Sequence, residues 1–165
     1  TKSGGETELD LKPMIFALSN PTSKAECTAK QAYTWSEGKC LFACGSPFAP
    51  VAVGNKTFVP RQGNNSYVFP GIGFGCIFVR AKTIPNQIFL TAAKTLANLV
   101  SESDLANGSL YPPLSQVREL SAHIAVAVAD YCFKNGLAQV ERPADLDKAV
   151  RDAMWQPTDP KFVFE

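Results

Sequence analysis

Residues 13–47 read PMIFALSNPTSKAECTAKQAYTWSEGKCLFACGSP, and this stretch decides the fold class. It opens with an apolar run, Pro13 to Leu18, which ends at turn residues and is typical of a strand covered on both faces. Thr28 and Gln31 have the spacing of a capping box, so a helix is expected next. A second buried strand, Leu41 to Cys44, follows it. Strand, helix and strand in this order predict an α/β fold with a βαβ unit of a parallel sheet.

The chain after this unit is expected to be mainly helical. Residues 50–60 favour a hairpin around Gly54-Asn55, and residues 61–66 favour a polar loop. A helix from Tyr67 to Arg80 is predicted to be buried on every side, with Pro70 in its first turns. Further helices are predicted over 85–100, from a cap at Ser115 to Asn135, and over 144–155. Residues 162–164 are predicted to be extended. Two strands alone do not form a stable isolated sheet. We therefore expect the chain to be a piece of a longer, multi-domain protein that completes the sheet.

Composition and charge exclude several classes of partner. The 165 residues carry 16 basic and 15 acidic side chains, a formal net charge of +1, without long runs of one sign. We therefore expect neither nucleic acid nor an anionic membrane surface as a partner. The apolar stretch of residues 67–79 is too short for a membrane span, which needs about 20 apolar residues. Five cysteines without the dense spacing of a secreted scaffold predict free, mostly buried thiols and an intracellular location.

Few residues suit catalysis or metal binding. His123 is the single histidine, so a catalytic or metal cluster of imidazoles is excluded. Gly71, Gly73 and Gly75 lack the spacing of a dinucleotide-binding turn, and close helix packing is the simpler interpretation. The carboxylates at predicted helix starts suit the helix dipole and do not predict a metal site; they are Glu102, Asp104, Asp145 and Asp147.

Two asparagine-bearing turns remain as candidate binding sites. One is residues 19–22, directly after the first strand, and the other is residues 63–66, before the predicted apolar helix. Ligands of open α/β sheets bind beyond the carboxyl ends of the strands, where Asn20 is expected. Its amide offers donors and an acceptor without adding charge. The alternative is a purely structural role, because Asn before Pro commonly begins a turn.

The same turns carry a resemblance to a known family. The strings LSNPTSKAEC (18–27), QGNNSYVFPG (62–71) and LYPPL (110–114) are highly specific, and the chain from about Lys12 to Gly136 resembles the C-terminal third of malic enzymes. One departure is Arg61, which stands where the family usually has Gly. The resemblance implies oxidative decarboxylation of L-malate to pyruvate and CO₂, with NAD or NADP as cofactor and Mg²⁺ or Mn²⁺ as metal.

The resemblance also implies roles for individual residues. Asn20 and Asn65, with Asn64 as the alternative to Asn65, are expected to contact malate, and Ser19, Asn20 and Asn65 are expected to contact the cofactor. The family carries its metal-binding carboxylates and its catalytic lysine and tyrosine upstream of these motifs. The resemblance therefore implies that this chain supplies orienting amides, holds no metal ligand or catalytic residue, and is inactive alone.

The resemblance further implies a domain organisation. Residues 1–64 are expected to close a Rossmann-like NAD(P)-binding domain, residues 65–137 to return as helices to the neighbouring domain, and residues 138–165 to form a terminal tail unit. The expected partners are the remainder of the same enzyme and further copies in a dimer or tetramer. Two alternatives stay open: a non-catalytic structural or oligomerisation module, and another nicotinamide dehydrogenase.

Overall fold

The computed structural model describes residues 12–157, which divide into two compact units. The first unit contains the chain up to Asn64 together with residues 100–113, and the second contains residues 65–99 and the chain from Leu114 onward. Residues 100–113 therefore pack with the first unit although they follow helices of the second in the sequence. The expected extended segment at 162–164 lies outside the described residues.

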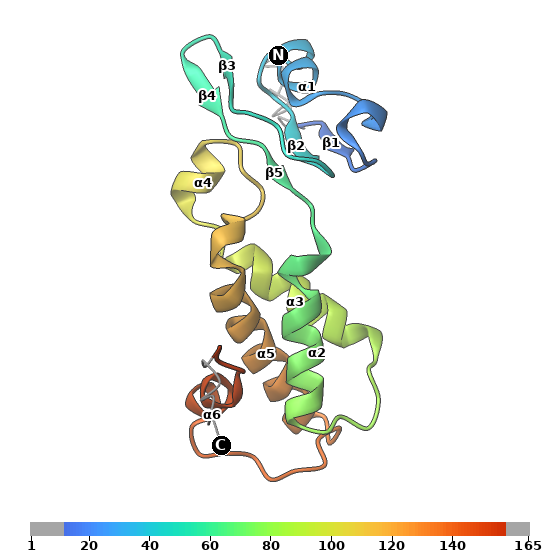
Figure 1. Ribbon diagram of the computed structural model, residues 1–165, viewed down its shortest axis with the longest axis vertical. Helices are drawn as coiled ribbons and strands as arrows, with labels where there is room; N and C mark the ends of the chain where they lie inside the picture. The colour runs from blue at the N-terminus through green and yellow to red at the C-terminus, as the bar shows by residue number, and fades with distance from the viewer. Residues whose placement is uncertain (1–11, 158–165) are drawn as a thin grey trace, which may run out of the picture. The chain divides into compact units, whose positions relative to one another are not determined.

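A parallel sheet forms the centre of the first unit (Figure 1). Its strands are β1 (Met14–Ala17), β2 (Leu41–Cys44) and β5 (Arg61–Gln62), in the order β1-β2-β5. Among the described residues β1 pairs with β2 alone, so it is an edge strand. The predicted parallel strand, helix and strand are confirmed. Strand β5 lies within the expected polar loop, and that prediction was wrong because two polar residues become a strand only through pairing with β2.

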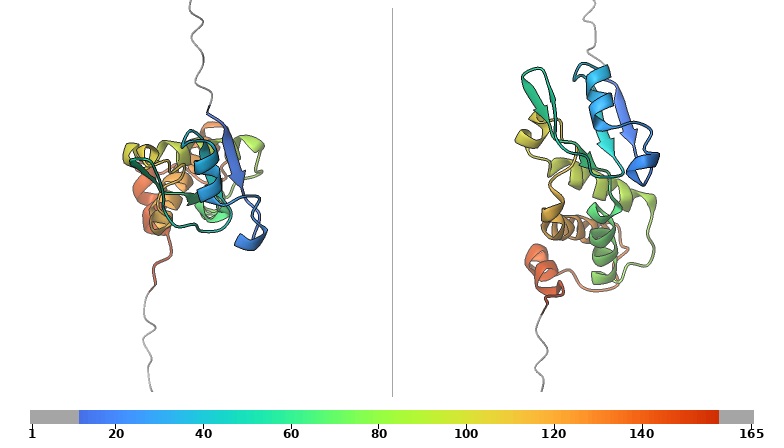
Figure 2. Two further views of the ribbon diagram at one scale, coloured as in Figure 1. Left: turned by 90° about the horizontal axis from the view of Figure 1, so that it is seen from above. Right: turned by 45° about the horizontal axis from the view of Figure 1, so that its top comes forward.

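Helix α1 (Ala29–Trp35) connects the first two strands and begins as predicted. The Thr28 hydroxyl accepts a hydrogen bond from the Gln31 backbone N–H at 3.2 Å, and the Gln31 side chain accepts from the Thr28 N–H at 2.9 Å. Tyr33 stacks on Phe58 with ring centroids 4.3 Å apart and meets the edge of Phe42 at 5.5 Å. Figure 2 shows α1 beside the sheet. The buried core consists of Ala17, Ala29, Ala32, Tyr33, Cys40, Phe42, Cys44 and Phe58.

The predicted hairpin is formed by β3 (Val51–Val53) and β4 (Lys56–Phe58), which pair antiparallel. Gly54 at its tip has a φ of 59°, which favours glycine. Helix α4 (Glu102–Ala106) packs near the end of this hairpin, where the Ser109 hydroxyl donates to the Val59 carbonyl at 2.6 Å.

The second unit is helical, and its centre is the crossing of α2 (Phe69–Phe78) and α5 (Val117–Lys134). An added Cβ on Gly71 would lie 2.7 Å from the Ile124 Cβ, and one on Gly75 would lie 2.8 Å from the Ala125 carbonyl oxygen. The interpretation as helix-packing residues is confirmed for Gly71 and Gly75, and it was wrong for Gly73, where nothing lies within 4 Å of an added Cβ.

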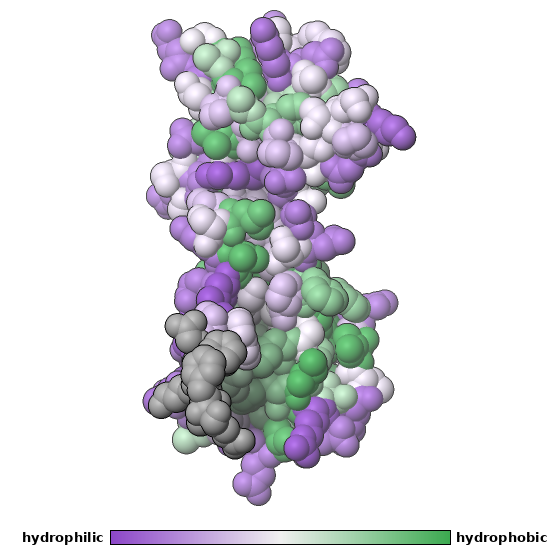
Figure 3. Space-filling model, in the orientation of Figure 1, coloured by the Kyte–Doolittle hydropathy of each residue, from purple (hydrophilic) through white to green (hydrophobic). Residues whose placement is uncertain are grey.

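The outer face of α2 differs from the prediction of burial on every side. Phe69 and Ile77 are each 74% exposed. Figure 3 shows hydrophobic residues gathered over the second unit on the face that α2 occupies in Figure 1. An apolar sequence does not by itself require burial all round: within residues 12–157 the buried positions of α2 are Gly71, Ile72, Gly75 and Cys76, and the helix packs mainly against α5.

The other helices of the second unit are α3 (Asn86–Asn98) and α6 (Leu146–Ala153), both near their expected positions. Short 3₁₀ turns complete the description: η1 (Thr22–Lys24), η2 (Asn65–Tyr67) and η3 (Leu114–Gln116). The prediction of Ser115 as the cap of the long helix was wrong, because Ser115 lies inside η3 and Gln116 precedes α5. No helix within the described part of the chain combines the length and hydrophobicity needed to cross a bilayer.

Candidate functional site

Polar residues follow all three strands of the parallel sheet at one edge. Ser19 and Asn20 come after β1, Gly45 and Ser46 after β2, and Gly63 and Asn64 after β5. The carboxyl ends of parallel strands meet at the same edge, and ligands of open α/β sheets bind there. The expectation that Asn20 lies beyond the end of a parallel strand is confirmed.

A side-chain hydrogen bond joins the first two of these loops. The Ser46 hydroxyl donates to Oδ1 of Asn20 at 2.7 Å. Ser46 is 6% exposed, whereas Asn20 is exposed. The Asn20 amide therefore lies at the surface, and its carbonyl oxygen is hydrogen-bonded to a buried hydroxyl. Ser46 was not among the sequence candidates; the signal that could have found it is its place after β2, which matches the place of Asn20 after β1.

The loop after β2 is fixed from both neighbouring strands. The Gly45 N–H donates to the Ala17 carbonyl at 2.8 Å, and the Gln62 side-chain amide donates to the Gly45 carbonyl at 3.0 Å. A Cβ on residue 45 would lie 2.1 Å from the Leu18 carbonyl oxygen. Only glycine fits this close approach, so the loops after β1 and β2 touch through their backbones.

Ser19 is engaged within its own turn. Its hydroxyl donates to Oε1 of Glu26 at 2.6 Å, and its backbone N–H donates to Oε2 at 3.3 Å. The hydrogen bond from the Ser19 hydroxyl lowers the pKa of the Glu26 carboxyl below its ordinary value. The carboxylate thus ties the two sides of the Asn20 turn together.

The two other candidate asparagines follow β5. The Gly63 N–H donates to the Cys44 carbonyl at 2.8 Å, which extends the sheet pairing to the start of this loop. Asn64 is exposed and ends this part of the first unit, while Asn65 is exposed, opens η2 and belongs to the second unit. The two residues are consecutive, so a single peptide bond joins their positions.

The side chains that directly follow the strands are neutral amides and hydroxyls, and the nearest carboxylate, that of Glu26, is bound to Ser19. Among the described residues no group of three or more His, Cys, Asp or Glu side chains comes together to hold a metal ion. Cys44 is buried on β2, and burial raises the pKa of its thiol. Arg61 lies 3.5 Å from the carboxylate of Asp104. Amides and hydroxyls can bind and orient acceptor atoms of a ligand, but they are poor proton-transfer groups.

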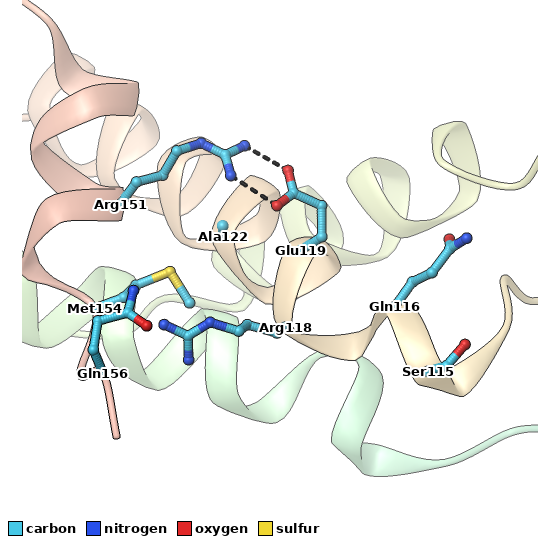
Figure 4. A pocket seen from close by; sticks show the side chains of 8 residues that line it. All are labelled: Ser115, Gln116, Arg118, Glu119, Ala122, Arg151, Met154 and Gln156. Atoms are coloured by element: carbon cyan, nitrogen blue, oxygen red, sulfur yellow. Dashed lines mark hydrogen bonds and ion pairs between the residues drawn. The ribbon is translucent and has the colours of Figure 1, made fainter. Parts of the chain in front are cut away.

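A hollow lies on the second unit between α5 and α6 (Figure 4). It measures about 390 Å³ and is lined by Ser115, Gln116, Arg118, Glu119, Ala122, Arg151, Met154 and Gln156. Its charged groups are paired with the protein itself. Arg151 holds both carboxylate oxygens of Glu119 at 2.8 and 2.9 Å, and Arg118 donates to the Trp155 carbonyl at 2.9 Å. These bonds fasten α6 and the following residues to α5.

Comparison with known families decides the relationship of this chain. Residues 5–133 match the profile described as malic enzyme, NAD-binding domain. The chain belongs to the malic enzyme family. All the candidate asparagines and Ser46 fall inside the matched range.

Curated relatives agree with this membership. The chain is 48% identical over 147 residues to an NADP-dependent malic enzyme of Dictyostelium discoideum, covering 89% of the chain and 27% of the relative. It is 50% identical over 145 residues to a mitochondrial NAD-dependent malic enzyme of Ascaris suum, covering 87% and 23%. The chain thus spans about a quarter of the length of these relatives.

Solved structures give the same result for the fold. The malic enzyme of Entamoeba histolytica superposes with a TM-score of 0.63 at 26% identity, over 86% of this chain and 26% of that one. The α/β architecture with a parallel sheet and helices is therefore that of a part of a malic enzyme.

Proposed function

We propose that this chain is the part of an NAD(P)-dependent malic enzyme that carries substrate- and cofactor-orienting amides. The complete enzyme would convert L-malate and NAD(P)⁺ into pyruvate, CO₂ and NAD(P)H. The observation that carries the proposal is the place of Asn20, exposed beyond the carboxyl end of β1 in a chain of the malic enzyme family.

Each candidate residue has a binding role in this proposal. Asn20 would donate N–H hydrogen bonds to a carboxylate of malate or to the carboxamide of the nicotinamide, without adding charge. Asn65, or Asn64 in its place, would contribute a second amide from the loop after β5. Ser19, which is tied to Glu26, would shape the turn beside the cofactor. None of these groups is assigned a proton transfer.

The divalent metal of the proposed reaction does not fit the described residues. Residues 12–157 bring together no group of three His, Cys, Asp or Glu side chains. We place the metal ligands and the acid and base in the rest of the enzyme.

The proposed context follows the expected organisation. Residues 1–64 would close the NAD(P)-binding domain, and residues 65–137 would return to the neighbouring domain, apart from residues 100–113, which pack with the first unit. Residues 138–165 would form the tail unit. The Dictyostelium relative is NADP-dependent and the Ascaris relative is NAD-dependent, so the proposal includes both cofactors. Five free cysteines support an intracellular enzyme, which we propose to be a homo-oligomer.

The test uses the complete polypeptide encoded by the gene. Malate-dependent reduction of NAD(P) is followed by the near-ultraviolet absorbance of NAD(P)H in the presence of Mg²⁺ or Mn²⁺. Asn20→Ala and Asn65→Ala should each lower kcat/KM by an amount equivalent to about 1–3 kcal/mol, the loss of a hydrogen bond to a charged group. Asn64→Ala tests the alternative: if Asn64 and not Asn65 contacts the ligand, Asn64→Ala should lower kcat/KM and Asn65→Ala should not.

The matched control is Asn98→Ala, which removes an exposed amide at the end of α3 and should leave the kinetics unchanged. Full activity in all three variants at the site would defeat the site assignment. A complete polypeptide without malate-dependent activity would defeat the function itself and favour the non-catalytic module or a different dehydrogenase substrate.

A further inference from the structure

Ser46 has a place in the site that its turn sequence does not reveal. We propose that Ser46 is a positioning residue, which fixes the Asn20 carboxamide so that its N–H donors, and not its carbonyl oxygen, face the ligand. This inference rests on the proposed function, because it concerns how the same site recognises its substrate or cofactor.

The geometry gives the orientation directly. The Ser46 hydroxyl donates to Oδ1 of Asn20 at 2.7 Å. A carboxamide is planar, with its oxygen and its amino group on opposite sides, so engagement of the oxygen turns the amino group away from Ser46. Within residues 12–157 no other hydrogen bond holds the Asn20 side chain, and Asn20 is exposed. Its two N–H groups are therefore available to an incoming acceptor.

Ser46 itself is held firmly enough to serve this purpose. It is 6% exposed, and its neighbour Gly45 is bonded to Ala17 on one side and to Gln62 on the other, at 2.8 and 3.0 Å. The backbone at residue 45 also lies against the Leu18 carbonyl, where no larger residue fits. A side chain held by such a support loses less conformational entropy on ligand binding than a freely rotating one.

The orientation determines which ligand atoms are recognised. The group opposite Asn20 must be an acceptor, such as a carboxylate oxygen of a hydroxy acid or the carboxamide oxygen of nicotinamide. An N–H donor facing a carboxylate makes a charge-assisted hydrogen bond, whereas a carbonyl oxygen in its place would repel the same group. Ser46 thereby selects the favourable one of two amide orientations before the ligand arrives.

The first experiment compares single variants in the complete polypeptide. Asn20→Ala should raise the KM for the ligand that Asn20 contacts, either malate or NAD(P). Ser46→Ala should raise the KM for that same ligand by roughly five- to tenfold, as expected for the loss of one neutral hydrogen bond. Ser46→Thr keeps the hydroxyl and should restore most of the affinity. The matched control is Ser109→Ala, which removes a buried hydroxyl that donates to the Val59 carbonyl and should lower the melting temperature without changing KM.

A double-mutant cycle separates positioning from general stability. In the Asn20→Ala background, Ser46→Ala should produce no further rise in KM, because no amide is left to orient. Asn20→Asp keeps an oxygen for Ser46 but removes the donors, so it should impair the enzyme more than Asn20→Ala does.

Three results would overturn the positioning role: an unchanged KM in Ser46→Ala, additive effects in the cycle, or near-normal kinetics of Asn20→Asp. If Ser46→Ala does not fold, Ser46→Thr and Asn20→Asp still decide. A complete wild-type polypeptide without malate-dependent NAD(P) reduction overturns the proposed function and this inference together. An active wild type with an impaired Asn20→Ala and an unaffected Ser46→Ala overturns the inference alone.

Discussion

The crossing of α2 and α5 allows a sharp test, because three glycines of one helix differ in what surrounds them. Gly75→Ala should destabilise the second unit, since its new Cβ would lie 2.8 Å from the Ala125 carbonyl oxygen and 3.0 Å from Val128. Gly73→Ala is the control in the same helix, because nothing lies within 4 Å of its added Cβ.

The magnitude follows from two opposing effects. Replacing glycine by alanine inside a helix stabilises it by about 1 kcal/mol. Overpacking a close contact costs about 1–3 kcal/mol, and a backbone oxygen cannot rotate away as a side chain can. Gly73→Ala should therefore stabilise the unit by about 0.5–1 kcal/mol. Gly75→Ala should be net destabilising, by up to about 2 kcal/mol, because the clash with a backbone oxygen exceeds the gain in helix propensity.

The assay must resolve one part of a multi-unit protein. Amide hydrogen exchange of peptides from α2 and α5, measured by mass spectrometry, reports the local free energy of opening. Exchange should become faster in Gly75→Ala and slower in Gly73→Ala. Equal stabilisation by both substitutions would refute the close helix contact, and equal destabilisation would refute the propensity reasoning.

Two further predictions concern charge and thiol chemistry. The hydrogen bond from Arg151 is the main cause that lowers the pKa of the Glu119 carboxyl. The stabilisation that this ion pair gives to α6 is therefore complete above the ordinary carboxyl pKa, and it is lost as the pH falls through the lowered pKa. Arg151→Gln should remove most of this acid sensitivity, and His123 should account for the remainder. The substitution should cost less than about 1 kcal/mol at neutral pH, because Glu119 is largely exposed and Arg151 is about one third exposed, and hydrogen exchange of α6 measures this cost. Burial raises the pKa of the Cys27 thiol as well as the pKa values of the Cys44, Cys76 and Cys132 thiols, so access and not pKa sets the order of modification. A thiol reagent at neutral pH should modify the half-buried Cys27 first, and mass mapping that finds Cys44 or Cys132 modified earlier would contradict this order.

The predictable parts of the fold are those specified by local chemistry. The capping box at Thr28 and the glycine at residue 38, with a φ of 74°, mark the two ends of α1 in the sequence itself. The apolar runs of β1 and β2 are equally local signals. Strand β5 was missed because Arg61 and Gln62 carry no strand pattern, and only their pairing with Ala43 and Cys44 makes them a strand.

The candidate site was predictable to the same extent. Asn20 could be selected as a candidate because ligands of open α/β sheets bind beyond the carboxyl ends of the strands, and the end of β1 is visible in the sequence. Ser46 stands in a Gly-Ser-Pro sequence that indicates an ordinary turn. Its hydrogen bond to Asn20 depends on the register in which Ala17 lies opposite Cys44, and that register is a tertiary property.

The edge position of β1 has a practical consequence for handling this polypeptide. Met14 is 67% exposed and Phe16 is 42% exposed on a strand that pairs on one side with β2. A strand edge that is unpaired among residues 12–157 is a template on which other chains can add, and such an edge promotes aggregation. We therefore expect recombinant material limited to these 165 residues to self-associate, and co-expression of the polypeptide that supplies the adjoining strand to keep it dispersed.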